Sequence, residues 1–315
     1  MSIFAFWPLV NGYLIRREKL LSKVLAVIAT ETNPRQLVQT DGVDYWLISG
    51  VNTLGDALRM RLHDFRAALD GPIGEKVAGR LGVPISDEIE IWGAGVTYLR
   101  SRDARKEESG MPDVYQRVYE ADRPEIFLKS TAIRCVGDGD KIGMRGDASA
   151  TVPEPEVVIV INRYEEIIGL TICNDVTARS IEGENPLYLS QAKIYIGSTS
   201  MGPTITPSWN ITEYKNVGIR SSIERNGATV WKAQTSLGDL NRTFEDLVSY
   251  LFRCQVFPDG VVLSTGTGII PPLDVALEEG DIVSITVDEV GTLTNQVEII
   301  PIDSNARANE TEGKA

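Results

Sequence analysis

Two apolar runs joined by a short polar turn restrict the fold of this chain more than any other feature. The runs are EVVIVI at 156–161 and IIGLTICND at 167–175, and they predict an antiparallel β-hairpin. Glu154 and Glu156 lie at the start of the first strand, where residues two apart point to the same face. Asp175 ends the second strand, so the hairpin returns it to the glutamate pair. The sequence therefore predicts three carboxylates at one end of the hairpin.

Three carboxylates at one end of an apolar hairpin repel one another and resist burial. A bound cation would remove that conflict. A site made only of oxygen ligands favours a hard cation, Mg²⁺ first, with Mn²⁺ or Ca²⁺ as alternatives. The other interpretation is structural, with two solvated glutamates at an exposed strand end and an aspartate that caps a helix. The residues alone leave both interpretations open.

Charge and composition limit the possible partners and compartments. The 315 residues carry a formal charge of −13, which argues against nucleic acid or an anionic membrane as a partner. No long uncharged apolar run is present, and the N-terminal residues lack the basic start and cleavage site of a signal peptide. Three scattered cysteines, an odd number, fit a reducing compartment, so we expect a cytoplasmic protein.

The pattern of the N-terminal part predicts a small α/β domain over residues 1–82. Residues 24–31 and 45–51 are candidate strands. Apolar residues at helical spacing predict a helix over 53–69, which Gly71 and Pro72 would end.

The remaining residues predict a larger domain over 83–303 and a polar tail over 304–315. The dipeptide Asn226-Gly227 between two alternating runs predicts a hairpin, and an apolar stripe predicts a helix over 236–254. Many strands without a repeating βαβ order indicate an α+β fold that is mostly β. These elements are expected to be scaffold.

One further strand is expected to carry functional groups. In RPEIFLKS at 123–130, the alternation of a strand puts Glu125, Phe127 and Lys129 on one face. Two ionisable groups beside a phenylalanine fit a pocket wall. An ordinary pair of cross-strand charges fits the same pattern.

Several separate blocks, in the same order, resemble the fumarylacetoacetate hydrolase superfamily. They are WGAGVTYLRSRDARKEE, RPEIFLKS, PEPE, NDVTAR, EGENPLYLSQAK, GSTSMGP and LSTGTGII, and the resemblance covers roughly residues 88–300. The ENPLY block and the Ser-Arg pair after Val-Thr-Tyr are most similar to the 2-keto-3-deoxy-sugar-acid dehydratases of pentose oxidation. The resemblance implies a mixed β-roll or sandwich with a small N-terminal α/β domain, assembled as a homodimer or homotetramer.

The resemblance also implies roles for particular residues. It assigns the metal to Glu154, Glu156 and Asp175. It makes Lys193 and Glu125 the candidate acid and base, without deciding which is which. It adds three residues as substrate-binding groups: Arg102, Lys129 and Thr267.

One departure from the hydrolytic members bears on the chemistry. Those members have a histidine after the tyrosine of the first block, but here Tyr98 is followed by Leu-Arg-Ser-Arg. The only histidine in the chain is His63, which is expected to lie on the surface. A missing histidine removes the usual base for activating water near neutral pH.

Three functions remain open at this point. The first is Mg²⁺-dependent dehydration of a 2-keto-3-deoxy-pentonate, of arabinonate or xylonate type, through a metal-stabilised enolate to 2,5-dioxopentanoate. The second is C–C bond hydrolysis or decarboxylation of acylpyruvate-type 2-keto acids on the same metal site. The third is a binding protein without catalysis. The absent histidine favours the first.

Overall fold

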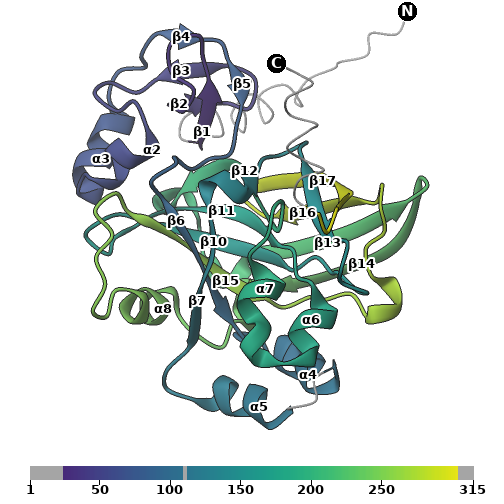
Figure 1. The fold of residues 1–315 in the computed structure, drawn as a ribbon. Helices are drawn as coiled ribbons and strands as arrows, with labels where there is room; N and C mark the ends of the chain where they lie inside the picture. Colours follow the sequence, from purple (N-terminus) through teal and green to yellow (C-terminus); the bar gives the residue numbers. More distant parts are fainter. Residues whose placement is uncertain (1–23, 109–111, 304–315) are drawn as a thin grey trace, which may run out of the picture.

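The computed structural model describes residues 24–108 and 112–303, which form two packed β-sheets with helices at their edges (Figure 1). Among these residues, twelve strands form the larger sheet, whose main order is β4-β3-β2-β1-β12-β11-β10-β15-β6-β7. Their bounds are β1 Val24–Ala29, β2 Gln36–Thr40, β3 Tyr45–Leu47, β4 Lys76–Val77, β5 Arg80–Leu81, β6 Glu90–Gly95, β7 Glu125–Thr131, β8 Cys135–Val136, β10 Pro155–Ile161, β11 Ile167–Asp175, β12 Thr199–Pro207 and β15 Val261–Thr267.

The smaller sheet has the order β14-β13-β16-β17-β9. Its bounds are β9 Lys141–Arg145, β13 Gly218–Arg225, β14 Ala228–Ser236, β16 Ile282–Val287 and β17 Gly291–Ile300. The α-helices are α2 Leu54–Leu58, α3 Leu62–Asp70, α4 Leu99–Glu108, α5 Pro112–Glu120, α6 Arg179–Glu184, α7 Leu189–Lys193 and α8 Phe244–Leu251. The predicted α+β, mostly β fold is confirmed.

The predicted hairpin is β10 and β11, and it lies in the middle of the larger sheet. Both of its faces are buried. Val157 and Ile159 pack in a core with the smaller sheet, whereas Val158 and Val160 pack in a second core with the N-terminal elements. A strand buried on both faces reads as a continuous apolar run, which explains why EVVIVI does not alternate with polar residues.

The larger sheet continues across the expected boundary at residue 82. Strand β1 pairs antiparallel with β12, with Leu25 opposite Ile205. The N-terminal strands therefore share a sheet and a core with the rest of the protein. The division into a 1–82 domain and an 83–303 domain stays a prediction. Residues 1–23 and the expected tail over 304–315 lie outside the described residues.

The predicted helix over 53–69 was wrong in one respect, because it is two helices, α2 and α3. The helical path is interrupted between Leu58 and Leu62, where residues of the β10–β11 turn donate hydrogen bonds to backbone oxygens. The Arg163 amide donates to Leu58 O at 3.0 Å, and Asn162 Nδ2 donates to Met60 O at 3.0 Å. These contacts come from residues about a hundred positions away, so local periodicity could not reveal the break.

The predicted helix over 236–254 was too long, since α8 covers only Phe244–Leu251. Before it, Leu240 forms a β-bridge with Tyr98, and the Asn241 amide donates to Thr97 O at 2.9 Å. These contacts hold the preceding residues away from a helical path, and Thr243 caps the shorter helix. The Asn226-Gly227 hairpin is confirmed as the turn between β13 and β14, with both residues at positive φ.

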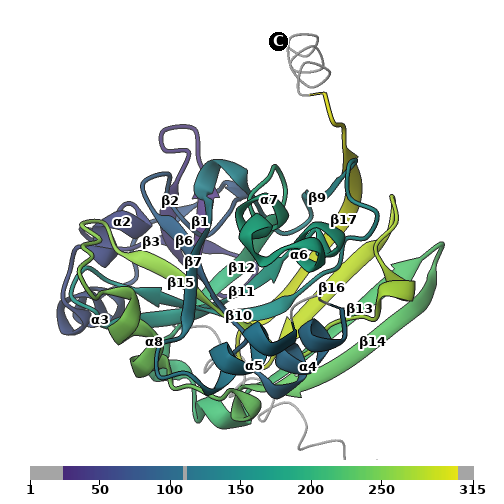
Figure 2. The same ribbon diagram turned by 60° about the horizontal axis from the view of Figure 1, so that its bottom comes forward.

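Helices α4, α5, α6 and α7 gather at the end of the larger sheet where β11 finishes (Figure 2). None of the helices in the described part of the chain is long and apolar enough to cross a bilayer. All three cysteines are free thiols; Cys135 and Cys173 are buried and Cys254 is exposed.

Candidate metal centre and active site

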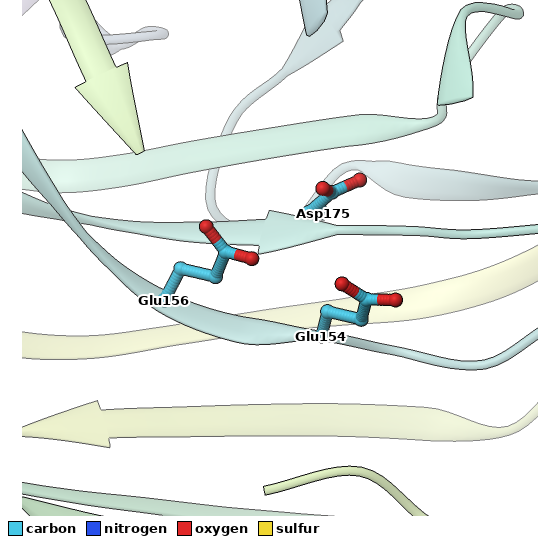
Figure 3. A group of neighbouring side chains, drawn as sticks. All are labelled: Glu154, Glu156 and Asp175. Carbon is cyan, nitrogen blue, oxygen red and sulfur yellow. The ribbon is translucent and has the colours of Figure 1, made fainter. Parts of the chain in front are cut away.

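The β10–β11 hairpin brings the three predicted carboxylates together. Glu154 directly precedes β10, Glu156 is its second residue, and Asp175 ends β11. The Asp175 amide donates to Glu154 O at 3.0 Å, which pairs the two chains at this point. All three side chains are buried, and each offers an oxygen within 4.8 Å of the others (Figure 3).

The C-terminal half of strand β15 holds Glu156. Its Oε2 accepts from Ser264 Oγ at 2.5 Å and from the Gly266 amide at 2.8 Å. Gly266 has φ +88°, and a Cβ atom there would lie 2.0 Å from Thr97 Oγ1. Only glycine can therefore bring this amide to the carboxylate.

Lys193, at the end of α7, lies among the carboxylates. Its ammonium donates to Asp175 Oδ2 at 2.9 Å, to Glu154 Oε2 at 3.0 Å and to Thr177 Oγ1 at 2.7 Å. Only 1% of its side chain is exposed. A lysine this buried is uncommon unless it is paired, so its position reflects the anionic site around it.

Two further charged residues belong to this cluster and were missed in the sequence. Arg179 Nη2 lies 2.7 Å from Glu154 Oε1, and its Nη1 lies 3.2 Å from Glu182 Oε2. Both side chains are only 3% exposed. Their spacing of three on α6, directly after Asp175, is the available signal. Charged residues in a short polar stretch are normally solvated, which hid their role.

Lys129 lies next to Asp175 and is fully buried. Its ammonium is 2.8 Å from Asp175 Oδ1, and it donates to the carbonyl oxygens of Lys193 at 2.5 Å and Ser198 at 2.8 Å. Strand alternation correctly put Lys129 on the face of Glu125 and Phe127. Lys129, however, is not one of the residues that line the cavity.

A small cavity of about 10 Å³ opens over the carboxylates. Glu125 and Phe127 of β7 form one wall, and a Cβ atom at Gly95 would lie 2.0 Å from Glu125 Oε2. The glycine in β6 therefore lets Glu125 lie against the neighbouring strand. The other residues of the wall are Ala94, Gly95, Val96, Ser101, Glu154, Glu156, Asp175, Glu182, Leu189, Lys193, Gly266 and Thr267.

The predicted substrate-binding residues lie in different surroundings. Thr267 lines the cavity, but its hydroxyl donates to Ile269 O at 2.9 Å. Arg102 pairs with Asp103 at 2.6 Å and stacks over Tyr119, and it is not among the lining residues. Neither placement tests a contact with substrate, so both roles stay predictions.

The protein's sole histidine, His63, is not among the residues of this cavity. His63 is 77% exposed and lies 3.1 Å from Asp64. The expected surface position is confirmed. Ser101, at the start of α4, is the residue of the Ser-Arg pair that reaches the cavity wall.

The electrostatics of the cluster favour a cation. Burial, and then the charges of Asp175 and Glu154, raise the pKa of Glu156 to about 8. Asp175 Oδ1 accepts no well-aligned hydrogen bond, although the Lys129 ammonium is close by. The donor set is all oxygen, as Mg²⁺ prefers, and ligand oxygens on opposite sides of a Mg²⁺ ion lie about 4.2 Å apart. The residues present therefore fit a hard divalent cation.

Residues 90–298 match the family model described as fumarylacetoacetate (FAA) hydrolase C-terminal. The chain belongs to the fumarylacetoacetate hydrolase family. The resemblance noted from the sequence blocks is thereby confirmed.

Two curated proteins resemble the chain over about two thirds of its length. One, from Haloferax volcanii, is named probable 2-keto-3-deoxyxylonate dehydratase; it is 47% identical over 215 residues, 68% of this chain and 74% of the relative. The other, 2-dehydro-3-deoxy-D-arabinonate dehydratase from Saccharolobus solfataricus, is 41% identical over 222 residues, 69% of this chain and 74% of the relative.

Solved structures of 2-keto-3-deoxy-D-arabinonate dehydratase have the same fold. The apo form is 33% identical with a TM-score of 0.76, covering 88% of this chain and 99% of that one. A second structure, complexed with magnesium and 2,5-dioxopentanoate, is 32% identical with a TM-score of 0.75, covering 89% and 99%. The likeness to these structures thus covers more of the chain than residues 90–298.

Proposed function

We propose that the protein is a Mg²⁺-dependent dehydratase of a 2-keto-3-deoxy-pentonate, of arabinonate or xylonate type, with 2,5-dioxopentanoate as product. The observation that carries this proposal is the buried trio of Glu154, Glu156 and Asp175 beside Lys193 and Glu125, in a cavity wall without histidine. The names of the two curated relatives and of the solved structure with magnesium and 2,5-dioxopentanoate support the same substrate class.

Glu154, Glu156 and Asp175 would hold the ion. When bound, Mg²⁺ supplies Lewis acidity that favours the negative charge developing on a 2-keto acid as a C3 proton leaves. Ser264 and Gly266 orient the carboxylate of Glu156, and Arg179 orients that of Glu154. Partners of this kind fix the direction of ligand oxygens.

Lys193 and Glu125 are the acid and base in this proposal. Dehydration moves the C3 proton to a base, gives a proton to the departing C4 hydroxyl and leaves a C3=C4 double bond. Loss of a proton from C5 and return of one to C3 converts this product to the C4=C5 enol, which tautomerises to the C5 aldehyde. Both side chains face the one cavity, Lys193 from α7 and Glu125 from β7, so they can act on two positions of one substrate. The geometry leaves open which of them takes the first proton.

Arg102 and Thr267 are proposed substrate-binding residues on the strength of the family resemblance. Thr267 already lies in the cavity wall, whereas Arg102 lies nearby on α4. Substrate is an anion and the chain is strongly negative, so local cations must recruit it. We further propose a cytoplasmic homodimer or homotetramer, as the resemblance implies.

Hydrolysis of acylpyruvates is less well supported. It needs a base that activates water, and because the wall contains no histidine, a carboxylate such as Glu125 would have to take that role. The alternative of a binding protein without catalysis predicts no turnover, and its discriminating sign is failure to bind Mg²⁺ although the carboxylates are intact.

A coupled assay with 2-keto-3-deoxy-arabinonate and Mg²⁺, before and after EDTA, tests the proposal by following 2,5-dioxopentanoate. We expect metal-dependent turnover that falls about 10²- to 10⁴-fold in Lys193→Met. Release of pyruvate from acylpyruvates, with no dioxopentanoate, would replace the dehydratase by a hydrolase. Absence of both products and of Mg²⁺ binding would indicate a binding protein.

A further inference from the structure

Lys129 is the most deeply buried lysine in the cluster, and the proposed mechanism gives it no step. None of its side-chain surface is exposed. A buried ammonium is costly unless all of its charge is matched, so a lysine with no access to solvent needs a specific reason. Its contacts show what that reason is.

The contacts of Lys129 join two separate parts of the site. On one side, its ammonium lies 2.8 Å from Oδ1 of Asp175, a proposed metal ligand. On the other side, it donates to the carbonyl oxygens of Lys193 at 2.5 Å and Ser198 at 2.8 Å. A longer contact reaches Val176 O at 3.4 Å. Three of the four groups are backbone carbonyl oxygens, one of them that of Lys193, and the fourth is the carboxylate of a proposed metal ligand.

The carbonyl of Lys193 is the backbone group that Lys129 connects to Asp175, in addition to the direct contact of the Lys193 ammonium with Asp175 Oδ2 at 2.9 Å. Lys193 is the last residue of α7, a helix of five residues, and Ser198 precedes β12. Ser198 Oγ also donates to Lys193 O at 2.9 Å, which gives that carbonyl a second donor. The Lys193 carbonyl at the end of α7 is therefore held by two donors, and Lys129 connects that carbonyl to the carboxylate of Asp175.

We propose that Lys129 is a positioning residue that fixes Asp175 for metal binding and sets the backbone of Lys193 relative to it. The proposal rests on the metal site of the proposed function. It replaces the substrate contact that the sequence suggested for Lys129, because the ammonium points at Asp175 and backbone oxygens and does not line the cavity. Partners that orient metal ligands in this way typically affect metal affinity about 10- to 100-fold.

The test uses Lys129→Met, with Lys141→Met as the matched control. Lys141 is also a strand lysine near a carboxylate, but its side chain is 58% exposed. We expect Lys129→Met to weaken Mg²⁺ binding, measured by calorimetry on the full chain, about 10- to 100-fold. At saturating Mg²⁺ we expect KM to stay within about twofold and kcat to fall. Lys141→Met should match the wild type in all three.

A double-mutant cycle with Asp175→Asn keeps the proposal testable if Lys129→Met folds poorly. Removing Lys129 alone leaves the buried Asp175 charge with Lys193 but without the Lys129 ammonium at Oδ1, so in EDTA the melting temperature should fall by roughly 10 °C. In the Asp175→Asn background the same change should cost much less, because the charge is absent. Failure of the double variant to fold would mean that Lys129 serves the fold and not Asp175, and would overturn the proposal.

The outcomes separate this proposal from the function on which it rests. A raised KM with unchanged Mg²⁺ affinity would return Lys129 to substrate binding. Equal losses in both backgrounds, with Mg²⁺ affinity unchanged, would leave only a structural role. If the wild type itself binds no Mg²⁺, the proposed function fails, whereas the cycle in EDTA still decides whether Lys129 and Asp175 are coupled.

Discussion

The two ends of the β10–β11 hairpin hold a glutamate in opposite ways, with Glu166 partly exposed at the turn and Glu156 buried at the open end. At the turn, Glu166 accepts hydrogen bonds from Asn162 Nδ2 at 2.6 Å and from the Leu62 amide at 2.7 Å. Burial alone would raise the pKa of Glu166, but these hydrogen bonds hold it below its usual value. At the open end, burial and two neighbouring carboxylates raise the pKa of Glu156 to about 8.

The difference shows which end of the hairpin is complete without a ligand. At the turn, the side-chain oxygen Oδ1 of Asn162 accepts hydrogen bonds from the backbone amides of Tyr164 and Glu166, both at 2.9 Å. The side-chain nitrogen Nδ2 of Asn162 donates to Met60 O at 3.0 Å. Its polar groups are satisfied within the chain. At the open end, the anionic charge of Glu156 is opposed by its surroundings, and a bound cation would favour it.

Replacing Glu156 should have the largest effect on activity. Glu156→Gln keeps the shape of the side chain but removes a proposed metal ligand, so we expect kcat/KM with Mg²⁺ to fall at least about 10²-fold. The measurement is the coupled dioxopentanoate assay over a range of Mg²⁺ concentrations. Glu165→Gln, an exposed glutamate in the hairpin turn, is the matched control and should keep full activity. Equal activity in the two variants would remove Glu156 from the metal site.

The stability of the metal-free protein should depend on pH in the direction set by Glu156. Its folded pKa of about 8 exceeds the value near 4.5 expected when unfolded, so the folded state binds more protons between them. The free energy of unfolding in EDTA should therefore fall, by on the order of a few kcal/mol, as pH rises from about 5 to 8.5. Urea unfolding at several pH values measures this. Glu156→Gln should flatten the profile, and a flat wild-type profile would contradict the shift.

Asn162 should matter for stability and not for chemistry. Asn162→Ala removes the side chain that joins the hairpin turn to the break between α2 and α3. It leaves Met60 O and two turn amides without their partner, so we expect a loss of about 2–3 kcal/mol. Urea unfolding measures the loss, and kcat per folded molecule should stay within about twofold of the wild type. A large fall in kcat would show that the two ends of the hairpin are coupled.

The same two ends mark what the sequence could and could not predict. Alternation on a strand and the return of a hairpin were enough to place Glu154, Glu156 and Asp175 together, because both rules are local. The break between α2 and α3 was missed, since Asn162 and Glu166 create it from a distant part of the chain. Regular local geometry was thus predictable, and tertiary hydrogen bonds that interrupt it were not.

The burial of charged side chains was the second feature that the sequence could not predict. Arg179 and Glu182 occupy a short polar stretch that looks like an ordinary solvated turn, and only the three-dimensional structure brings them to the carboxylates. Strand alternation predicted the face of β7 on which Lys129 lies but not its partners, which are Asp175 and backbone oxygens. The direction of a side chain follows from sequence, whereas its partner depends on what the fold packs against it.

Replacing Glu166 should have the smallest effect and sharpen the comparison most. Glu166→Gln keeps an acceptor for Asn162 and Leu62 but removes the charge, so we expect a loss of about 1 kcal/mol at pH 7. The pKa of Glu166 is lowered on folding, so its contribution is present above the unfolded value near 4.5 and is lost as pH falls through the folded value. The free energies of unfolding of the wild type and Glu166→Gln should therefore converge in acid, and the wild type should be the more stable at pH 7. Those of the wild type and Glu156→Gln should also converge in acid, but above pH 7 the variant should be the more stable. Urea unfolding of both variants in EDTA between pH 3.5 and 9 measures the two trends, and trends of the same sign would mean that the hairpin ends do not differ in the way their hydrogen bonds indicate.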